Sequence, residues 1–213
     1  MRVTVKLTTH DENQSARQVS LPILYDGDHD PTKAMVKKAL DEQIHCDFEL
    51  VADNGARIRC HKLFLACQSE FFKRMFETNC VETLENACKL KQSEETVRAF
   101  IKYLYSGDLD GAKKSQPIVF NLMEMAHCYN IPYLENAMKK IILDLPITSL
   151  DVNVALLMFS FASKVEGYED IKEKTTLLIR WKPKEVLECE ALKSILKYEL
   201  DTVKQLLAIG LNQ

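Results

Sequence analysis

The chain has 213 residues, 46% of them hydrophobic and 28% charged, so it can bury a substantial core and is not disordered by composition. Its formal charge of −3 offers no basic excess for a phosphate backbone, which argues against a nucleic-acid partner. The longest apolar runs are too short to span a bilayer, and the opening sequence MRVTVKLTTHDENQ lacks the apolar core of a signal peptide. We therefore expect an intracellular protein with one large domain, or a small domain with an appendage.

The seven cysteines fit the same compartment, because an odd number without a CxxC pair does not make a secreted disulfide framework. Cys60-His61 and His127-Cys128 contain zinc-ligand types, but a structural zinc site needs two closely spaced ligand pairs. We predict that most of the cysteines are small buried hydrophobes, with no metal and no cofactor. Cys80, in a polar segment, is the predicted exposed thiol.

Residues 1–30 precede the first predicted helix. Arg2–Leu7 alternates as a strand does, Val19–Tyr25 is a second candidate strand, and Asp26–Asp30 is an acidic turn. We interpret residues 1–30 as a strand and linker remnant.

A helix is predicted from Pro31, since proline is favoured in a first helical turn. Its apolar positions fall on one stripe, with lysines and acids on the other side. The stripe consists of Met35, Val36, Ala39, Leu40 and Ile44. It packs either on its own domain or on another copy of the chain.

A β-hairpin follows. Phe48, Leu50 and Ala52 alternate before Asp53-Asn54-Gly55, whose residues tolerate the positive φ of a primed turn, and the alternation resumes to Cys60. The apolar spacing then becomes helical up to Phe76, with Ser69 as the expected N-cap of the second of two short helices.

Further elements are mostly helical. We predict a polar loop over residues 77–86, a short strand near Cys88–Leu90, and a helix from Ser93 to Gly107. Helices over 118–129 and 132–143 follow, and beyond a break at residues 145–149 the pattern is helical to the end.

An enzyme is not indicated. The six glycines are scattered, and no GxSxG or HExxH motif is present. Neighbours such as Cys60 and His61 point in different directions on a strand or helix, so they do not form a dyad. Acidic pairs such as Glu94-Glu95 are expected at a helix start or on a solvated face.

Across residues 32–143 the motif residues follow a definite order. They are Asp47, His61-Lys62, Leu65-Ala66, Ser69, Phe71-Phe72, Met75-Phe76 and Tyr103–Gly107. In order and spacing the chain resembles the BTB/POZ domain, most of all the speckle-type POZ protein group. The resemblance implies an α+β fold: a BTB/POZ domain over residues 31–145, with a short mixed sheet flanked by helices, and an all-α BACK/3-box-like extension over 146–213. In that group a substrate-reading MATH domain comes first, for which residues 1–30 are too few.

The resemblance also implies a dimer built on the first helix, which favours Met35, Val36, Ala39 and Leu40 as interface residues over packing within one chain. It gives Asp47 and His61 structural roles, with Lys62 or an arginine as a partner for Asp47.

BTB adaptors bind the N-terminal helices of a cullin scaffold beside the helix that contains Phe71–Phe76, aided by a hydrophobic-x-acid signature in the next loop. By position that signature is Cys80-Val81-Glu82 here, although cysteine is a weak apolar anchor. The alternative is an ordinary exposed loop. The candidate cullin-binding residues are Phe72, Met75, Phe76, Cys80, Val81, Glu82, Tyr129 and Asn130, of which Met75, Phe76 and Tyr129 could equally belong to the core.

The last helix carries the stripe Val203, Leu206, Leu207 and Leu211. The corresponding tail self-associates in the speckle-type POZ group, but capping the core of the extension is the favoured interpretation.

The predicted function is a dimeric substrate adaptor of a cullin-3-type ubiquitin ligase, in the nucleus or the cytoplasm. Its predicted partners are a second copy, a cullin and a protein substrate, with no nucleic acid and no membrane. The alternatives are an oligomerisation scaffold or transcriptional co-regulator that binds no ligase, and a truncated chain that pairs with full-length BTB-MATH adaptors and regulates them.

Overall fold

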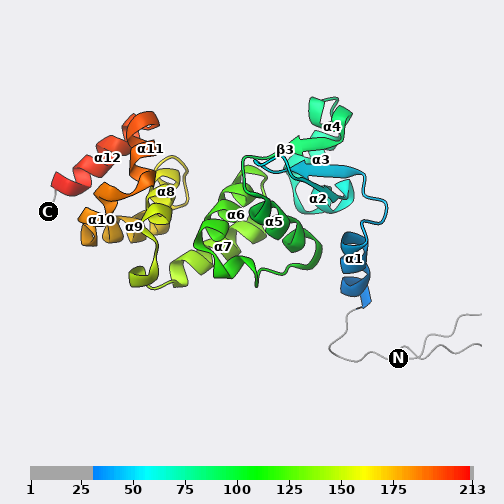
Figure 1. Ribbon diagram of the computed structural model, residues 1–213, viewed down its shortest axis with the longest axis horizontal. Helices are drawn as coiled ribbons and strands as arrows, with labels where there is room; N and C mark the ends of the chain where they lie inside the picture. Colours follow the sequence, from blue (N-terminus) through cyan, green and yellow to red (C-terminus); the bar gives the residue numbers. More distant parts are fainter. Residues whose placement is uncertain (1–30, 212–213) are drawn as a thin grey trace, which may run out of the picture.

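The computed structural model describes residues 31–211, with side chains up to Ile209. Residues 48–90, which hold the strands and short helices, lie at one end of the molecule (Figure 1). Helices between residues 94 and 144 form the middle, and those from residue 152 onward form the other end. The strand and linker predicted for residues 1–30 fall outside the described part of the chain.

Three short strands make a mixed sheet in the order β2-β1-β3. They are β1 (Phe48–Val51), β2 (Arg57–Cys60) and β3 (Ala87–Lys89). Strand β2 runs antiparallel to β1 with Ile58 opposite Leu50, and β3 runs parallel to β1. At the hairpin turn Gly55 has a φ of 84°, and the Asn54 side chain accepts a hydrogen bond of 2.9 Å from the N–H of Ala56. The predicted hairpin is thereby confirmed.

Helices surround this sheet and continue away from it. They are α1 (Pro31–Asp41), α2 (Lys62–Gln68), α3 (Glu70–Phe76), α4 (Val81–Glu85), α5 (Glu94–Ser106), α6 (Gln116–Cys128) and α7 (Pro132–Asp144). The predicted caps are confirmed: the hydroxyls of Ser69 and Ser93 accept hydrogen bonds from the N–H groups of Phe72 and Thr96, and Gly107 ends α5 with a φ of 69°.

The rest of the described chain contains helices and no strand. It contains the 3₁₀ turn η2 (Ile147–Ser149), α8 (Val152–Ala162), α9 (Glu169–Trp181), α10 (Pro183–Glu188), α11 (Glu190–Tyr198) and α12 (Leu200–Leu211). Asp151 caps α8 by accepting a 3.0 Å hydrogen bond from the N–H of Val154. The α+β fold with a helical extension is confirmed. Trp181, the last residue of α9, is exposed.

The extension is fastened to the middle helices by two polar side chains. Gln116, at the start of α6, donates to Ser149 O and accepts from the N–H of Asp151, both at 2.8 Å. Lys174 of α9 donates to three carbonyl oxygens at the end of α7, those of Ile142, Leu143 and Leu145.

One hydrophobic cluster extends from Phe48 to Ile195, across both the predicted BTB/POZ domain and the extension. The division after residue 145 therefore stays a prediction.

Two segments differ from expectation. The polar loop predicted over residues 77–86 contains α4, which ends at Asn86 in the left-handed region with a φ of 49°. The 3₁₀ turn η1 (Ala112–Lys114) lies between the helix predicted to end at Gly107 and the one predicted from residue 118. Both are single turns without an apolar stripe of their own, so periodicity does not reveal them.

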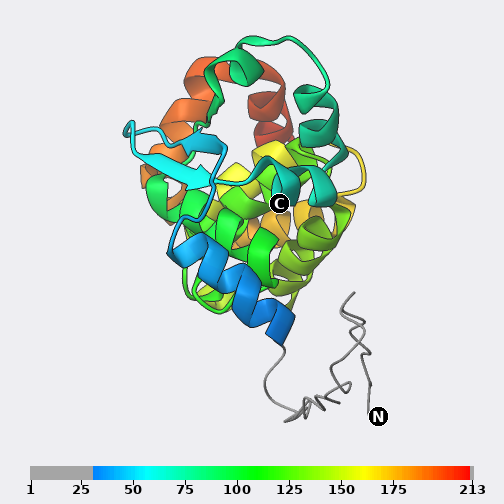
Figure 2. The same ribbon diagram turned by 90° about the vertical axis from the view of Figure 1, so that its right-hand side faces the viewer.

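Helix α1 lies on the outside of the molecule, beside α5 (Figure 2). None of its residues is buried. Among the described helices, none has the length and apolar content needed to cross a membrane.

Candidate functional site

A groove of about 570 Å³ opens beside α3. Its walls come from α3, from the turn that leads into α4, from β3 and from the end of α6. The lining residues are Glu70, Phe71, Arg74, Met75, Thr78, Cys80, Glu82, Cys88, Cys128 and Asn130. Most of its lining surface is apolar, while charged side chains stand among the lining residues, as in grooves that receive a partner's side chains.

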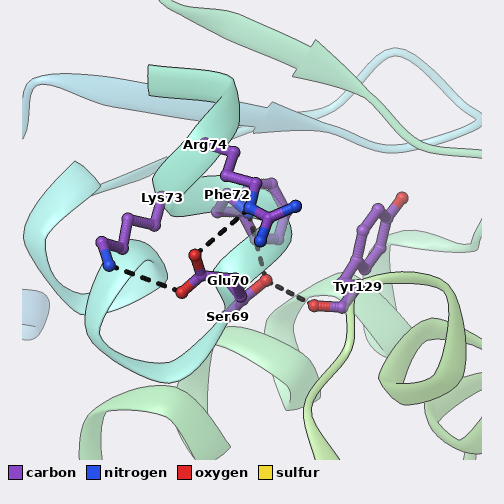
Figure 3. Close-up of polar contacts among 6 residues, drawn as sticks. All are labelled: Ser69, Glu70, Phe72, Lys73, Arg74 and Tyr129. Atoms are coloured by element: carbon purple, nitrogen blue, oxygen red, sulfur yellow. Dashed lines mark hydrogen bonds and ion pairs between the residues drawn. The ribbon is translucent and has the colours of Figure 1, made fainter. Parts of the chain in front are cut away.

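Ser69 sets the distance between two of these walls (Figure 3). Its buried hydroxyl accepts a hydrogen bond from the N–H of Phe72 at the start of α3. The same hydroxyl donates to Tyr129 O, 2.5 Å away, just after α6 ends. Asn130 then turns the chain with a φ of 51°, a conformation that asparagine tolerates. One capping serine thus ties α3 to the end of α6.

Charged residues of α3 form a small network on the outer side of the groove. Glu70 lies 3.2 Å from Arg74 Nε and 3.5 Å from Lys73 Nζ (Figure 3). The Arg74 hydrogen bond and the nearby Lys73 hold the pKa of the Glu70 carboxyl below its usual range. All three side chains are substantially exposed, so the network contributes little to stability and mainly fixes the direction of Arg74.

On the α4 side, Glu82 presents a carboxylate. Its pKa is lowered chiefly by a hydrogen bond from its own backbone N–H, and then by the Cys80 thiol. The Cys80 sulfur lies 3.6 Å from Thr83 Oγ1, and hydrogen bonds from Thr83 lower the pKa of this thiol as well. Cys80 is half-buried, which differs from the exposed thiol that the sequence predicted.

Four of the eight predicted cullin-binding residues line this groove: Met75, Cys80, Glu82 and Asn130. The other four do not. Phe72 is fully buried, so the prediction that it contacts a partner is wrong; its ring supports the wall from behind. Phe76 packs on Phe48, with ring centroids 5.0 Å apart.

Tyr129 packs its ring on Phe71, Phe72 and Phe100, as a core residue does. Val81 is exposed on α4 but is not among the lining residues. The contact of the lining residues with a cullin stays a prediction.

The groove is also lined by Phe71, Arg74, Cys88 and Cys128, which the sequence had not indicated as site residues, and by Glu70 and Thr78. The helical spacing of Phe71, Arg74 and Met75 at i, i+3 and i+4 is a signal for the first two. Cys88 and Cys128 reach the groove from β3 and α6, so only the tertiary fold brings them there.

Both residues with predicted structural roles bond to groups from other parts of the chain. Asp47 is exposed and accepts a 2.8 Å hydrogen bond from the N–H of Lys62, so its partner is a backbone group at the start of α2. His61 uses both ring nitrogens, with Nδ1 2.5 Å from the Tyr105 hydroxyl and Nε2 2.6 Å from Ile44 O. His61 therefore links the segment after α1 to α2 and α5.

The predicted dimer residues lie on a helix that its own chain covers only partly. Met35 has 72% of its surface exposed, while Val36 and Leu40 pack partly against the core. A second cavity of about 480 Å³ lies between α1, β2 and α5. Dimerisation through α1 stays a prediction.

In the predicted self-association stripe on α12, Val203 and Leu206 pack partly against the core and Leu207 is exposed. The side chain of Leu211 lies outside the described part of the chain. Two of the residues therefore contribute to the extension's own packing, and self-association stays a prediction.

The groove is lined by apolar and charged side chains that suit contact with another protein. Within the residues that the structure describes, no group of three His, Cys, Asp or Glu side chains could hold a metal ion.

A family model for the BTB/POZ domain matches residues 36–145, which is more than half of the chain. The chain belongs to the BTB/POZ domain family. BTB/POZ domains are protein-interaction modules, which agrees with a site made of apolar walls and oriented charges.

Several curated BTB/POZ proteins are similar to the chain. A putative BTB/POZ domain-containing protein of Arabidopsis thaliana is 36% identical over 46% of this chain and 64% of its own length. Kelch repeat and BTB domain-containing protein 8 of Xenopus tropicalis is 26% identical over 69% of this chain and 23% of its own length.

Kelch repeat and BTB domain-containing protein 2 of horsepox virus is 23% identical over 82% of this chain and 35% of its own length. The chain thus spans less than two thirds of each of these relatives. The finer resemblance to the speckle-type POZ group stays a prediction.

Proposed function

We propose that this BTB/POZ protein is a non-catalytic, dimeric adaptor that recruits a cullin-type ubiquitin-ligase scaffold through the groove beside α3. The observation that carries the proposal is the groove itself, where Phe71 and Met75 supply apolar walls and Glu82 a fixed carboxylate. It lies beside the helix at which the BTB resemblance implies cullin binding. The apolar walls would take a side chain of the partner helix, while the Glu82 carboxylate accepts its hydrogen bonds and sets its orientation.

The helical extension supports the same proposal. Matches to kelch-repeat BTB proteins cover up to 82% of the chain, well past the part matched by the BTB/POZ family model. We take the extension as BACK-like, held on the domain by Gln116 and Lys174. In a dimer built on α1, two such units would present two partner sites together, which raises the effective concentration of one bound protein near another.

The decisive experiment is calorimetry of the purified chain against a cullin N-terminal domain. Glu82→Lys reverses the charge at the groove and is expected to abolish measurable binding, a loss of at least about 2 kcal/mol. Glu85→Lys is the matched control, because Glu85 is exposed on the same short helix but does not line the groove. Equal binding by both variants, or none by the native chain, contradicts the proposal.

A second candidate is a BTB oligomerisation scaffold that binds no ligase, and Cys80 is the observation that favours it. Cysteine is smaller and less apolar than the large hydrophobic residue expected at the first position of the signature. If the native chain is a dimer by light scattering but shows no calorimetric binding to the cullin domain, the result supports the scaffold function. A regulator of full-length BTB-MATH adaptors is a third candidate; it requires mixed dimers after co-expression.

A further inference from the structure

The cavity of about 480 Å³ between α1, β2 and α5 is separate from the groove beside α3, because the two share no lining residue. Its floor is apolar: α1 contributes Leu40, β2 contributes Ile58, and α5 contributes Ile101 and Tyr105. Ile58, Ile101 and Tyr105 are buried, and Leu40 packs partly against the core. The floor is therefore formed by side chains that core packing holds in place.

Four cationic side chains surround this floor, and all of them are exposed. They are Lys37 of α1, Arg59 of β2, and Arg98 and Lys102 of α5. Two carboxylates also line the cavity, so its charge balance is positive. The chain as a whole carries a formal charge of −3, so the cavity differs in sign from the molecule that contains it.

The two cations on α5 already have a carboxylate partner. Lys102 bonds to Asp108, which lines the cavity, at 2.6 Å, and this bond raises the pKa of the lysine so that it stays charged. Arg98 lies 2.6 Å from Glu94, which is outside the cavity. The other carboxylate on the lining belongs to Asp41.

The cations on α1 and β2 are different. Among residues 31–209, neither Lys37 nor Arg59 has a carboxylate within ion-pair distance, and Arg59 donates a long hydrogen bond of 3.5 Å to Cys46 O. Ammonium and guanidinium groups carry several N–H donors each, and their strongest acceptors are carboxylates. Two cations beside an apolar floor are thus left for carboxylates from outside the described chain.

The position of the cavity favours an extended peptide as the ligand. Among the described strands β2 pairs only with β1, so half of its backbone N–H and C=O groups point away from the sheet. A peptide lying beside β2 would place an apolar side chain on the floor and carboxylates against the cations on either side. BTB/POZ domains are protein-interaction modules, and the negative charge of the whole chain disfavours a nucleic acid.

We propose that this cavity is a second docking site, which binds an acidic peptide segment with an apolar anchor from another protein. Leu40, Ile58 and Ile101 contact the anchor, while Lys37 and Arg59 bind the carboxylates that flank it. An adaptor would then hold the ligase scaffold in the groove beside α3 and the protein brought to the ligase in this cavity. That division of roles rests on the function proposed above, whereas the binding of the peptide does not.

The first test is fluorescence anisotropy of the full chain with a fluorescein-labelled peptide of sequence EEDLSLDEE at low ionic strength. The native chain is expected to bind it, and Lys37→Glu and Arg59→Glu should each weaken binding at least about tenfold. Lys38→Glu is the matched control, because it makes the same change of net charge on α1 outside the cavity, and should weaken binding less than about twofold. No binding by the native chain, or equal losses in the three variants, overturns the proposal.

A second peptide tests the apolar floor without changing the protein. The peptide EEDSSSDEE keeps the charge but has no leucine, so it should bind at least about tenfold more weakly. Equal binding of the two peptides would mean that the cations attract any acidic chain, and the docking site would be refuted.

Two outcomes would identify a different occupant and overturn the proposal. If the probe binds the triple variant Asp26→Asn, Asp28→Asn, Asp30→Asn but not the native chain, the protein's own acidic segment fills the cavity. If adding the probe lowers the mass measured by light scattering, a second copy fills it.

The final measurement separates the two proposals. Calorimetry of the cullin domain against the chain saturated with the probe should give the same affinity as without it, because the two sites share no lining residue. A chain that binds the probe but no cullin refutes the proposed function and leaves the docking site standing. Loss of cullin binding when the probe is bound refutes two separate sites.

Discussion

Helices α1 and α8 are both eleven residues long, yet they relate to the rest of the molecule in opposite ways. Eight residues of α8 are buried, whereas α1 has none. The apolar residues of α8 surround the helix and are enclosed by α9, α10 and α11. Those of α1 form a stripe that its own chain covers only on the side of Val36 and Leu40. A helix of the first kind holds a fold together, and one of the second kind gains most from a second molecule.

The largest expected effect comes from the enclosed helix. Phe159→Ala in α8 removes a fully buried ring and should lower the free energy of unfolding by about 3–5 kcal/mol. Denaturant unfolding followed by circular dichroism measures the change. Leu157→Ala is the matched control on the same helix, because its partly exposed side chain should cost no more than about 1 kcal/mol. Similar losses in both variants contradict the burial described for α8.

The next effect should appear in association and not in folding. Met35→Glu places a charge on the open side of α1 and should weaken the dimer by at least about 2 kcal/mol, roughly 30-fold. The free energy of unfolding of the monomer should stay within about 0.5 kcal/mol of the native value. Light scattering over a dilution series measures the dimer. Lys33→Glu, on the same helix but outside the apolar stripe, should leave it intact; equal dissociation in both variants argues against this interface.

A smaller, pH-dependent effect is expected at Glu199, which lies between α11 and α12 and bonds to Ser160 of α8. Burial alone would raise the pKa of Glu199, but bonds from Lys164, Ser160 and Thr202 hold it below its usual value. The folded-state pKa thus lies below the unfolded-state value of about 4.3. This stabilisation is present above that pH and is lost as the pH falls through the folded-state pKa.

Glu199→Gln should therefore destabilise the chain by about 1–2 kcal/mol at pH 7 and have much less effect near pH 3. Urea unfolding of both chains at the two pH values measures this. A loss that is the same at both pH values would show that the charge of Glu199 is not its source.

The smallest effect belongs to the polar side of α1. Lys38 and Glu42 lie 3.9 Å apart, and both side chains are more than half exposed. Lys38→Ala should change the free energy of unfolding by no more than about 0.5 kcal/mol. A loss above 1 kcal/mol in the same urea titration would mean that this side of α1 is packed, and the contrast with α8 would weaken.

Sequence reasoning works best where a residue acts through its neighbours in the chain. The hairpin turn at Gly55 and the caps at Ser69, Ser93 and Gly107 were predicted because their signals lie within four residues. Helix α4 was missed, since a single turn without an apolar stripe gives no period.

The groove was half predicted for the same reason. Met75, Cys80 and Glu82 are near one another in the chain, whereas Cys88 and Cys128 arrive from β3 and α6. The error at Phe72 is instructive: adjacent phenylalanines on one helix face different ways, so Phe71 lines the groove and Phe72 fills the core. Only the packed structure distinguishes them.

Lys174 has a consequence for the order of events during synthesis. The carbonyl groups at the end of α7 are satisfied by an amine about thirty residues further along the chain. While the ribosome has not yet released α9, those oxygens must bond to water in place of the Lys174 ammonium group. When α9 emerges, burying the ammonium group lowers the pKa of Lys174 through desolvation, and the three carbonyl dipoles replace its lost hydration. A nascent chain that stops short of α9 would therefore leave these three carbonyl oxygens to water.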